Sequence, residues 1–328
     1  MRDIGLTGND EARAPTHVGF LLIPGFSLLP FASAIEPLRA ANQLSGRSLY
    51  RWTYIAVDGV AAAASNGVVV TAGAGLETFD DYDYVFICAG GNPAAFRHAP
   101  TFAWLRRLAR RGVRLAGVSG GPYLLARARL LAGYRFTIHW EHAAALIEDF
   151  PQLDLRRSLF EIDRERLTFF FFYSAIYLIY TILAREHGPA LATAVSEWFL
   201  QTQVRDGAGP QRMTLRERLG VAHAPLLLVV ERMERTLETP TSRQHLAELA
   251  GLSLRQLERL FRRHLGRSLG AHYMMLRLDR ARDLLRQTSM TVLEIALACG
   301  FSSASHFSRS YRRRFGRPPR AERPAAGA

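Results

Sequence analysis

The sequence contains no lysine, so all 42 basic residues are arginine; with 29 acidic residues the net charge is +13 over 328 positions. A GC-rich coding bias explains arginine in place of lysine, but it does not explain where the arginines gather. Residues 225–328 hold 19 arginines and 9 acidic residues, whereas residues 1–224 hold 23 and 20. Because the planar arginine fork suits phosphates and guanine edges, we expect the C-terminal third to bind a polyanion.

Cysteine is nearly absent as well. Cys88 and Cys299 fall in different predicted domains, which argues against a disulfide framework and is typical of a reducing compartment. Residues 1–17 contain acidic residues where a secretory signal has its apolar core. We therefore expect a cytoplasmic protein.

Only one long uncharged apolar run is found, "LTFFFFYSAIYLIYTILA" at residues 167–184. Its length meets the lower limit for a membrane-spanning helix. An alternating, strand-like stretch precedes it and an amphipathic helix follows it, so the pattern favours a buried strand end plus a buried helix. A membrane-tethered protein is the alternative.

Upstream of this run, short apolar segments alternate with helical patterns. The runs "HVGFLLIPGF", "YRWTYIAVDG", "YDYVFICAGG" and "VRLAGVSGG" are typical of buried strands, and "LLPFASAIEPLRAANQLSG" and "TFAWLRRLARRG" of helices. This alternation predicts an α/β doubly wound, largely parallel sheet, whose ligands bind beyond the carboxyl ends of the strands.

Composition divides the chain further. We expect the α/β domain to span residues 16–206 and to close with the helix "PALATAVSEWFLQTQVRD", and residues 207–224, which begin with "GAGPQ", to form a linker. An all-α domain should occupy residues 225–320. The proline-rich residues 321–328 should form a disordered tail.

Two helix-turn-helix units are predicted in the all-α domain. In "SRQHLAELAGLSLRQLERLFRRHLG" Gly251 suits a tight turn and Ser253 can cap the second helix. The pattern recurs 49 positions later around Gly300, and an amphipathic helix between the units can hold them rigidly apart. Two such helices can enter successive major grooves, roughly 34 Å apart. A helical domain that binds only proteins is the alternative.

The residues expected to contact DNA lie on the second helix of each unit. We predict base or backbone contacts from Ser253, Arg255, Gln256, Arg259, Ser303, Ser305, His306 and Arg309. Phosphate contacts are expected from Arg312, Arg313, Arg314 and Arg317.

A serine follows a predicted strand in "GVSGGPYLL". Strand, glycine-rich turn and helix form the elbow that exposes a nucleophile, here Ser119, and the stretch fits the loose Gly-x-Ser-x-Gly pattern. A base is also needed, and His139 follows one structural element later, with Glu36 on the first helix able to approach. Each residue also has an ordinary structural interpretation, as a core histidine or a surface carboxylate.

These patterns resemble known families. Residues 225–320 look like the AraC-type DNA-binding domain, and "IALACGFSSASHFSRSYRRRFGRPPR" is close to its signature. The whole chain from about residue 16 to residue 320 resembles the GlxA-type regulators, whose N-terminal domain is similar to the class I glutamine amidotransferase superfamily that includes PfpI-type proteases. In that resemblance Ser119 replaces the elbow cysteine, and thiolate chemistry is absent.

The resemblance implies an effector pocket rather than an active site. Glu36, Ser119, His139, Trp140 and Glu141 would suit a cationic small molecule through carboxylate pairing and cation–π contact. Relatives imply amino-acid or quaternary-amine effectors such as arginine, carnitine or glycine betaine. The chain departs from the family at "TFFFFYSAIYLIY", where relatives have small residues and a glycine pair, so these aromatics either line the pocket or form a repacked core.

We therefore predict a cytoplasmic transcription regulator, an activator that forms a homodimer. Its partners would be double-stranded promoter DNA with two half-sites, a small amine effector and RNA polymerase, with no cofactor and no metal. An amidase-like hydrolase that uses Ser119 is the alternative from another class.

Overall fold

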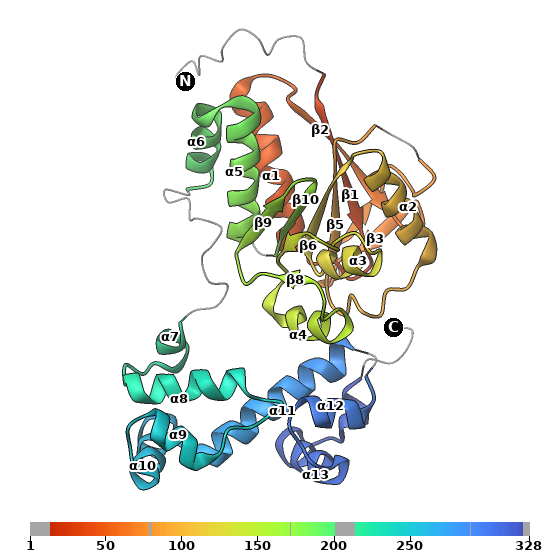
Figure 1. Ribbon diagram of the computed structural model, residues 1–328. Coiled ribbons are helices and arrows are strands. Elements are labelled where there is room, and N and C mark those ends of the chain that lie inside the picture. The colour runs from red at the N-terminus through yellow and green to blue at the C-terminus, as the bar shows by residue number, and fades with distance from the viewer. Residues whose placement is uncertain (1–13, 79–80, 171, 201–213, 289, 324–328) are drawn as a thin grey trace. The chain divides into compact units, whose positions relative to one another are not determined.

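The structure is a computed structural model that describes residues 14–78, 81–170, 172–200, 214–288 and 290–323. The chain divides into two compact units, Met1–Gln211 and Arg212–Ala328, which are described separately (Figure 1). The first is an α/β unit and the second is helical.

A six-stranded sheet forms the centre of the α/β unit, with strand order β2-β1-β5-β6-β10-β9. Neighbours are parallel except β9 and β10, which form an antiparallel pair. The predicted doubly wound, largely parallel sheet is confirmed. Its strands are β1 (Thr16–Leu22), β2 (Tyr50–Ala56), β5 (Tyr84–Ala89), β6 (Arg114–Ser119), β9 (Phe160–Asp163) and β10 (Arg166–Phe169).

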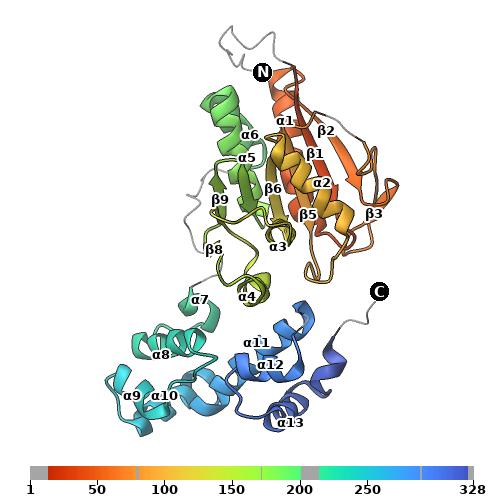
Figure 2. The same ribbon diagram turned by 45° about the vertical axis from the view of Figure 1, so that its right-hand side comes forward.

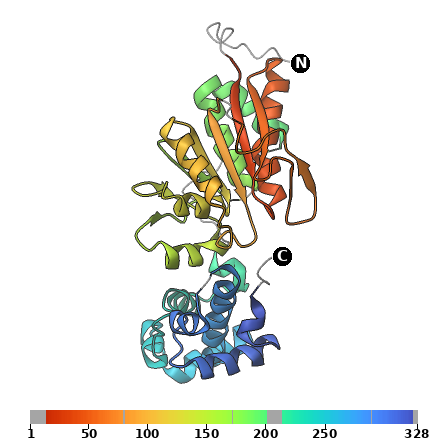
Figure 3. The same ribbon diagram turned by 90° about the vertical axis from the view of Figure 1, so that its right-hand side faces the viewer.

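Helices cover both faces of the sheet because consecutive side chains of its central strands are apolar and point to opposite faces. α1, α5 and α6 lie on one face, and α2 and α3 lie on the other (Figures 2 and 3). Val18 and Phe20 of β1 belong to the core on the first face, and Leu21 belongs to the core on the second, to which α4 also contributes. The helices are α1 (Leu28–Ser45), α2 (Ala99–Arg110), α3 (Gly121–Arg127), α4 (Trp140–Asp149), α5 (Phe172–His187) and α6 (Pro189–Trp198). Two small ribbons complete the unit: β3 (Ala61–Ala63) with β4 (Val69–Thr71), and β7 (Arg135–Phe136) with β8 (Asp154–Leu155).

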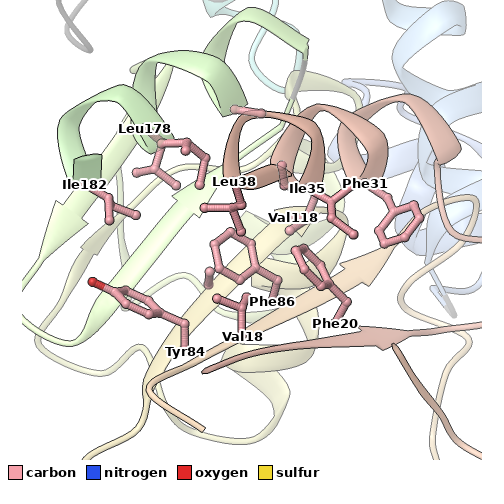
Figure 4. Packing of buried hydrophobic residues seen from close by; sticks show 14 of the residues in the cluster. Val18, Phe20, Phe31, Ile35, Leu38, Tyr84, Phe86, Val118, Leu178 and Ile182 are labelled. Carbon is pink, nitrogen blue, oxygen red and sulfur yellow. The ribbon is translucent and has the colours of Figure 1, made fainter. Parts of the chain in front are cut away.

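The apolar run at residues 167–184 is part of this core. It forms the end of β10 and most of α5, and Leu178 and Ile182 of α5 pack with α1 and the sheet (Figure 4). The predicted buried strand end and buried helix are confirmed. Among the described residues, no helix has both the length and the apolar character needed to span a membrane.

The helical unit consists of two helix-turn-helix units joined by a long helix. The first pairs α9 (Arg243–Leu249) with α10 (Leu254–Leu265), and the second pairs α12 (Val292–Ala298) with α13 (Ala304–Phe315). Between them runs α11 (Leu269–Gln287), which contacts α10 of the first unit and α12 of the second (Figure 1). The predicted all-α domain with two such units is confirmed. The unit begins with α7 (Leu215–Leu219) and α8 (Ala224–Arg235) and ends with the 3-10 helix η1 (Pro319–Glu322).

Three expected boundaries differ from the structure. The closing helix ends at Trp198 rather than near residue 206, and residues 201–213 lie outside the described residues. The predicted linker contains α7, whose Thr214–Glu217 capping box stabilises its start. The tail is not disordered from residue 321, because the buried Glu322 binds Arg286 and Arg317; residues 324–328 are outside the described residues.

Candidate functional site

Local sequence fixes the start of both recognition helices, α10 and α13. Oγ of Ser253 accepts the Gln256 amide at 3.3 Å, and Oε1 of Gln256 accepts the Ser253 amide at 2.8 Å. At α13, Oγ of Ser303 accepts the His306 amide at 3.3 Å. These three side chains, which we expected to contact DNA, therefore cap helices within the folded chain.

Arginines remain exposed along both helices. Arg255, Arg259, Arg309, Arg312 and Arg313 are exposed, and no ion pair or hydrogen bond from their side chains occurs in the described part of the chain. Exposed cationic forks of this kind can reach phosphates and base edges. Ser305 and His306 are also exposed on the first turn of α13.

Two arginines expected at phosphates have partners within the unit. Arg314 donates from Nη2 to both carboxylate oxygens of Asp279, at 2.7 and 2.8 Å. Arg317 donates to Glu322 at 2.8 Å. Their role as DNA contacts stays an untested prediction, and the structure gives both a stabilising role inside the unit.

The turn of the second unit is held by α11. Arg277 donates from Nε to the Cys299 carbonyl at 2.7 Å and from Nη2 to the Gly300 carbonyl at 2.6 Å. Its guanidinium also lies 4.1 Å from the centre of the Phe301 ring. Burial lowers the pKa of Arg277, yet the two carbonyls and the ring satisfy the cation. This side chain thus ties the turn before α13 to α11.

In the α/β unit, Ser119 adopts the elbow conformation. It ends β6 with φ of 57°, the left-handed region that a non-glycine residue rarely adopts. Gly121 follows at a close approach, since a Cβ there would lie 2.1 Å from the Ile87 carbonyl oxygen. Strain of about 1–3 kcal/mol at such a residue persists only where the surroundings enforce it. The structure thus places the strand-to-helix turn at the carboxyl edge of the sheet, where Ser119 itself is buried.

Strand register places His139 at the same edge. The Thr137 amide donates to Oγ1 of Thr168 at 2.8 Å, and Thr168 lies on β10, the parallel neighbour of β6. Two residues beyond each come His139 and Phe170, whose rings lie 5.5 Å apart. The pairing of β10 with β6 makes Phe170 level with Ser119. His139 and Ser119 therefore share one edge of the sheet, with Phe170 beside both.

The environment of His139 keeps its ring neutral. Burial, together with the neighbouring His142, lowers the pKa of His139 to about 4, although Glu141 opposes the shift. Nδ1 of His139 accepts the Glu141 amide at 3.4 Å as the cap of α4. A base with so low a pKa is poorly matched to proton transfer near pH 7.

Of the remaining residues predicted for the pocket, two lie beside His139 and one does not. Trp140 and Glu141 are exposed at the start of α4 next to His139. Glu36 instead accepts from Nε of Arg39 at 2.7 Å, and no hydrogen bond or ion pair in the described residues joins Glu36 to Ser119 or His139. The structure thus groups the α4 residues with the elbow but gives Glu36 a separate ion pair.

Two features of this edge were missed from the sequence. Ligand atoms of His139, Glu141 and His142 lie within 4.8 Å of one another, which is a geometry able to hold a metal ion. Oδ1 of Asn92 is buried without a hydrogen-bond partner among the described atoms. Its neighbour Pro93 touches the elbow, since a Cβ on Gly120 would lie 3.1 Å from it. The adjacent pair "GN" after a predicted strand was the available signal for Asn92.

The described phenylalanines of the aromatic run are buried. Phe169 lies in the core, with its ring 6.1 Å from that of Phe86, and Phe170 lies beside His139. The side chains of residues 171–173 lie outside the described part. Phe169 thus fits the interpretation of a repacked core, and a pocket lined by Phe170 stays a prediction.

Comparison with known proteins agrees with this arrangement. Residues 246–324 match a family model described as a helix-turn-helix domain, and residues 17–152 match the DJ-1/PfpI family. The chain is 45% identical over 304 residues to the HTH-type transcriptional regulator CdhR of Pseudomonas aeruginosa, covering 93% of this chain and 90% of that one. It is 41% identical over 325 residues to the HTH-type transcriptional regulator GlxA of Rhizobium meliloti, covering 98% and 100%.

A solved structure is similar to the α/β unit. The crystal structure of an AraC family transcriptional regulator from Pseudomonas putida is 29% identical, with a TM-score of 0.51, and covers 56% of this chain and 100% of that chain. The fold and the paired helix-turn-helix units thus define a transcriptional regulator with an AraC-type DNA-binding domain. The chain belongs to the GlxA-type regulators of the AraC family, which join this domain to a DJ-1/PfpI domain.

Proposed function

We propose that this regulator binds a small cationic amine or amino acid at the carboxyl edge of its α/β sheet and, in response, activates transcription from promoters with two half-sites. In this proposal the chain works in the cytoplasm as a homodimer, α10 and α13 read one half-site each, and the bound protein contacts RNA polymerase. The exposed, unpaired arginines on both recognition helices are the observation that carries it.

A cationic effector is supported by the groups at the Ser119 edge. The neutral His139, the carboxylate of Glu141 and the buried Oδ1 of Asn92 are all hydrogen-bond acceptors. Trp140 is 43% exposed and offers a face for cation–π contact. The charged groups that act on His139 are His142 and Glu141, and no arginine of the described residues forms an ion pair with Glu141, so an ammonium group would meet little repulsion.

We assign Ser119 a binding role rather than a catalytic one. A serine nucleophile depends on a base matched to the working pH, and the pKa of His139 is too low for that task. The amidase-like alternative makes a separate prediction: hydrolysis of activated esters or amides that disappears in Ser119→Ala. Turnover of that kind would replace the proposal of a pure effector pocket.

The first test is a selection of genomic DNA fragments by the full-length protein at near-physiological salt, with and without glycine betaine, carnitine or arginine. Enrichment of a few promoters with two half-sites, altered by one amine, is the expected result. Protein that stays soluble and enriches nothing under any condition would contradict the regulator's proposed mode of action.

Effector binding is tested separately by thermal unfolding of the α/β unit within the full chain. Glu141→Gln and Trp140→Ala should abolish the rise in melting temperature produced by the active amine. Glu148→Gln, which removes an exposed carboxylate from the same helix α4, is the matched control and should leave the shift unchanged. An equal loss in all three variants would assign the effector to another site.

A further inference from the structure

A basic groove runs beside the second recognition helix. Its volume is about 1030 Å³, and it lies between α13, the start of α12 and the 3-10 helix η1. Ser305 and Ser308 line it together with four arginines, Arg309, Arg312, Arg320 and Arg323. Half of these arginines come from α13, and the other half come from η1 or the residue after it. The groove therefore joins the recognition helix to a segment that we did not predict to meet DNA.

All the charged side chains that line the groove are positive, and they stand beside apolar residues such as Val292 and Pro319. No acidic residue is among the described residues that line it. Arg309, Arg312 and Arg320 make no ion pair in the described part of the chain, and Arg323 donates to the Met290 carbonyl, which leaves its charge uncompensated. Hydroxyls interleaved with arginines are the usual donors to phosphate oxygens. The chemistry of the groove suits a phosphodiester chain.

Ion pairs of a buried carboxylate hold one wall of the groove, the helix η1, in place. Glu322 is 1% exposed in its side chain, and its Oε1 accepts Nε of Arg286 at 2.7 Å and Nη2 of Arg317 at 2.8 Å. Although burial raises the pKa of Glu322, these hydrogen bonds hold it below its usual value. The carboxylate therefore ties η1 to the end of α11, and the ion pairs turn Arg317 and Arg286 toward Glu322 while Arg320 faces the groove.

We propose that this groove seats the sugar-phosphate backbone of the DNA strand that flanks the base pairs read by α13. Arg320 and Arg323 then add two phosphate contacts beyond the recognition helix, and Ser305, Arg309 and Arg312 share the same strand. This inference rests on the proposed binding of α13 to DNA. An acidic protein segment is the other occupant whose chemistry the groove would accept, and the test separates the two.

The experiment measures the affinity of the full-length protein for a selected promoter fragment between 50 and 200 mM salt, using the double variant Arg320→Ala/Arg323→Ala. Each phosphate contact contributes about 0.9 to the slope of log affinity against log salt, so the slope should fall by about 1.8. Specific and random DNA should lose affinity by the same factor. In ethylation interference, two adjacent phosphates on one strand beside the second half-site should weaken binding of the wild-type protein when they are ethylated. Ethylation of the same two phosphates should not affect binding of the variant.

Two variants keep the result interpretable. Arg106→Ala/Arg110→Ala removes two exposed charges from α2 in the α/β unit and should leave the slope unchanged. Arg320→Ala alone, which removes no hydrogen bond or ion pair of the described residues, should lower the slope by about 0.9 even if Arg323 is needed to hold Met290.

Three outcomes are decisive. A slope equal to wild type in the double variant overturns the proposal. Unchanged DNA binding with lost transcription would also overturn it and would assign the groove to an acidic protein partner. If the wild-type protein binds no DNA at all, the proposed role of the recognition helices fails. That result differs from one in which the wild-type protein binds DNA normally and the groove variants bind it equally well.

Discussion

The two helix-turn-helix units share a sequence pattern but differ in what surrounds their turns. Gly251 and Gly300 both have a positive φ, of 64° and 72°. A Cβ at Gly251 would meet nothing within 4 Å, whereas a Cβ at Gly300 would lie 2.5 Å from the Leu237 carbonyl oxygen and 2.8 Å from the Pro240 ring. The second turn is therefore packed against the segment that leads into the first unit.

The supports around each unit differ as well. Arg277 and Glu322 fix the turn and the tail of the second unit, and a row of rings in tilted or edge-on contact runs from Phe301 to Phe315. The first unit has a mainly aliphatic core that includes Leu246 and Leu257, together with Phe261. The comparison teaches that the turn of the second unit is held by contacts distant in sequence, whereas the turn of the first is open and that unit is held by its caps and by a core shared with α8 and α11.

The largest expected effect comes from Gly300→Ala. The added methyl group makes the left-handed backbone cost about 1–2 kcal/mol, and it also forces the loop at residues 237–240 to move. The free energy of unfolding of the second unit should therefore fall by about 3 kcal/mol or more. Gly251→Ala is the matched control and should cost only the backbone penalty. Native-state hydrogen exchange of the amides in α12 and α13 measures the loss.

Equal destabilisation by the two alanine variants would mean that the packing of Gly300 against the loop contributes nothing. The comparison would then reduce to two equivalent turns.

A smaller loss of stability is expected when the pH is lowered, and it should affect the first unit. His272 is buried beside Phe261, and neither ring nitrogen has a hydrogen-bond partner among the described atoms. Burial lowers its pKa from 6.5 to about 4, with Arg267 adding to the shift and Asp279 opposing it. As pH falls below 6.5 the unfolded chain takes up a proton that the folded unit resists, so the free energy of unfolding falls as the pH drops from about 6.5 toward 4, with a loss of about 2 kcal/mol by pH 5.

His272→Phe should remove this pH dependence, since the ring is already among apolar neighbours. Hydrogen exchange of α9 and α10 between pH 7 and pH 5 measures it, with His245→Gln, an exposed histidine of α9, as the control. A pH dependence that survives in His272→Phe would assign acid sensitivity to another group.

Sequence patterns predict those parts of the two units that depend on neighbours within one turn. Gly251, Gly300, Ser253 and Ser303 are recognisable because turns and caps have strong local preferences. The ion pair of Arg314 with Asp279 was not predictable, since it joins residues 35 apart on different helices. Arginines with and without a partner look the same in sequence, so the division between structural and free cations comes only from tertiary contacts.

The α/β unit shows the same limit. The elbow at Ser119 follows from strand, glycine and helix in succession, and the largely parallel sheet follows from strands that alternate with helices, but no pattern gave the order of the strands. Glu36 was placed at the pocket from a resemblance, but its partner Arg39 lies one turn away on the same helix. The place of His139 depends on the hydrogen bond from Thr137 to Thr168, which no periodicity in the chain indicates. Edges of a sheet are assembled by such long-range contacts.

The smallest expected effect separates the two units as DNA readers. Arg259 and Arg309 occupy the same turn of α10 and α13, and both are exposed without a described partner. Replacing either by alanine should weaken binding to the selected promoter about tenfold, or about 1.4 kcal/mol, and relax base preference in one half-site only. Arg259→Ala and Arg309→Ala should therefore affect different half-sites when binding is measured on fragments with each half-site scrambled in turn.

Because the second unit is held by Arg277, Glu322 and the loop against Gly300, its half-site should tolerate fewer base changes than the first. Loss of preference at the same half-site in both variants would mean that one recognition helix alone reads the sequence, and the greater rigidity of the second unit would then have a purely structural role.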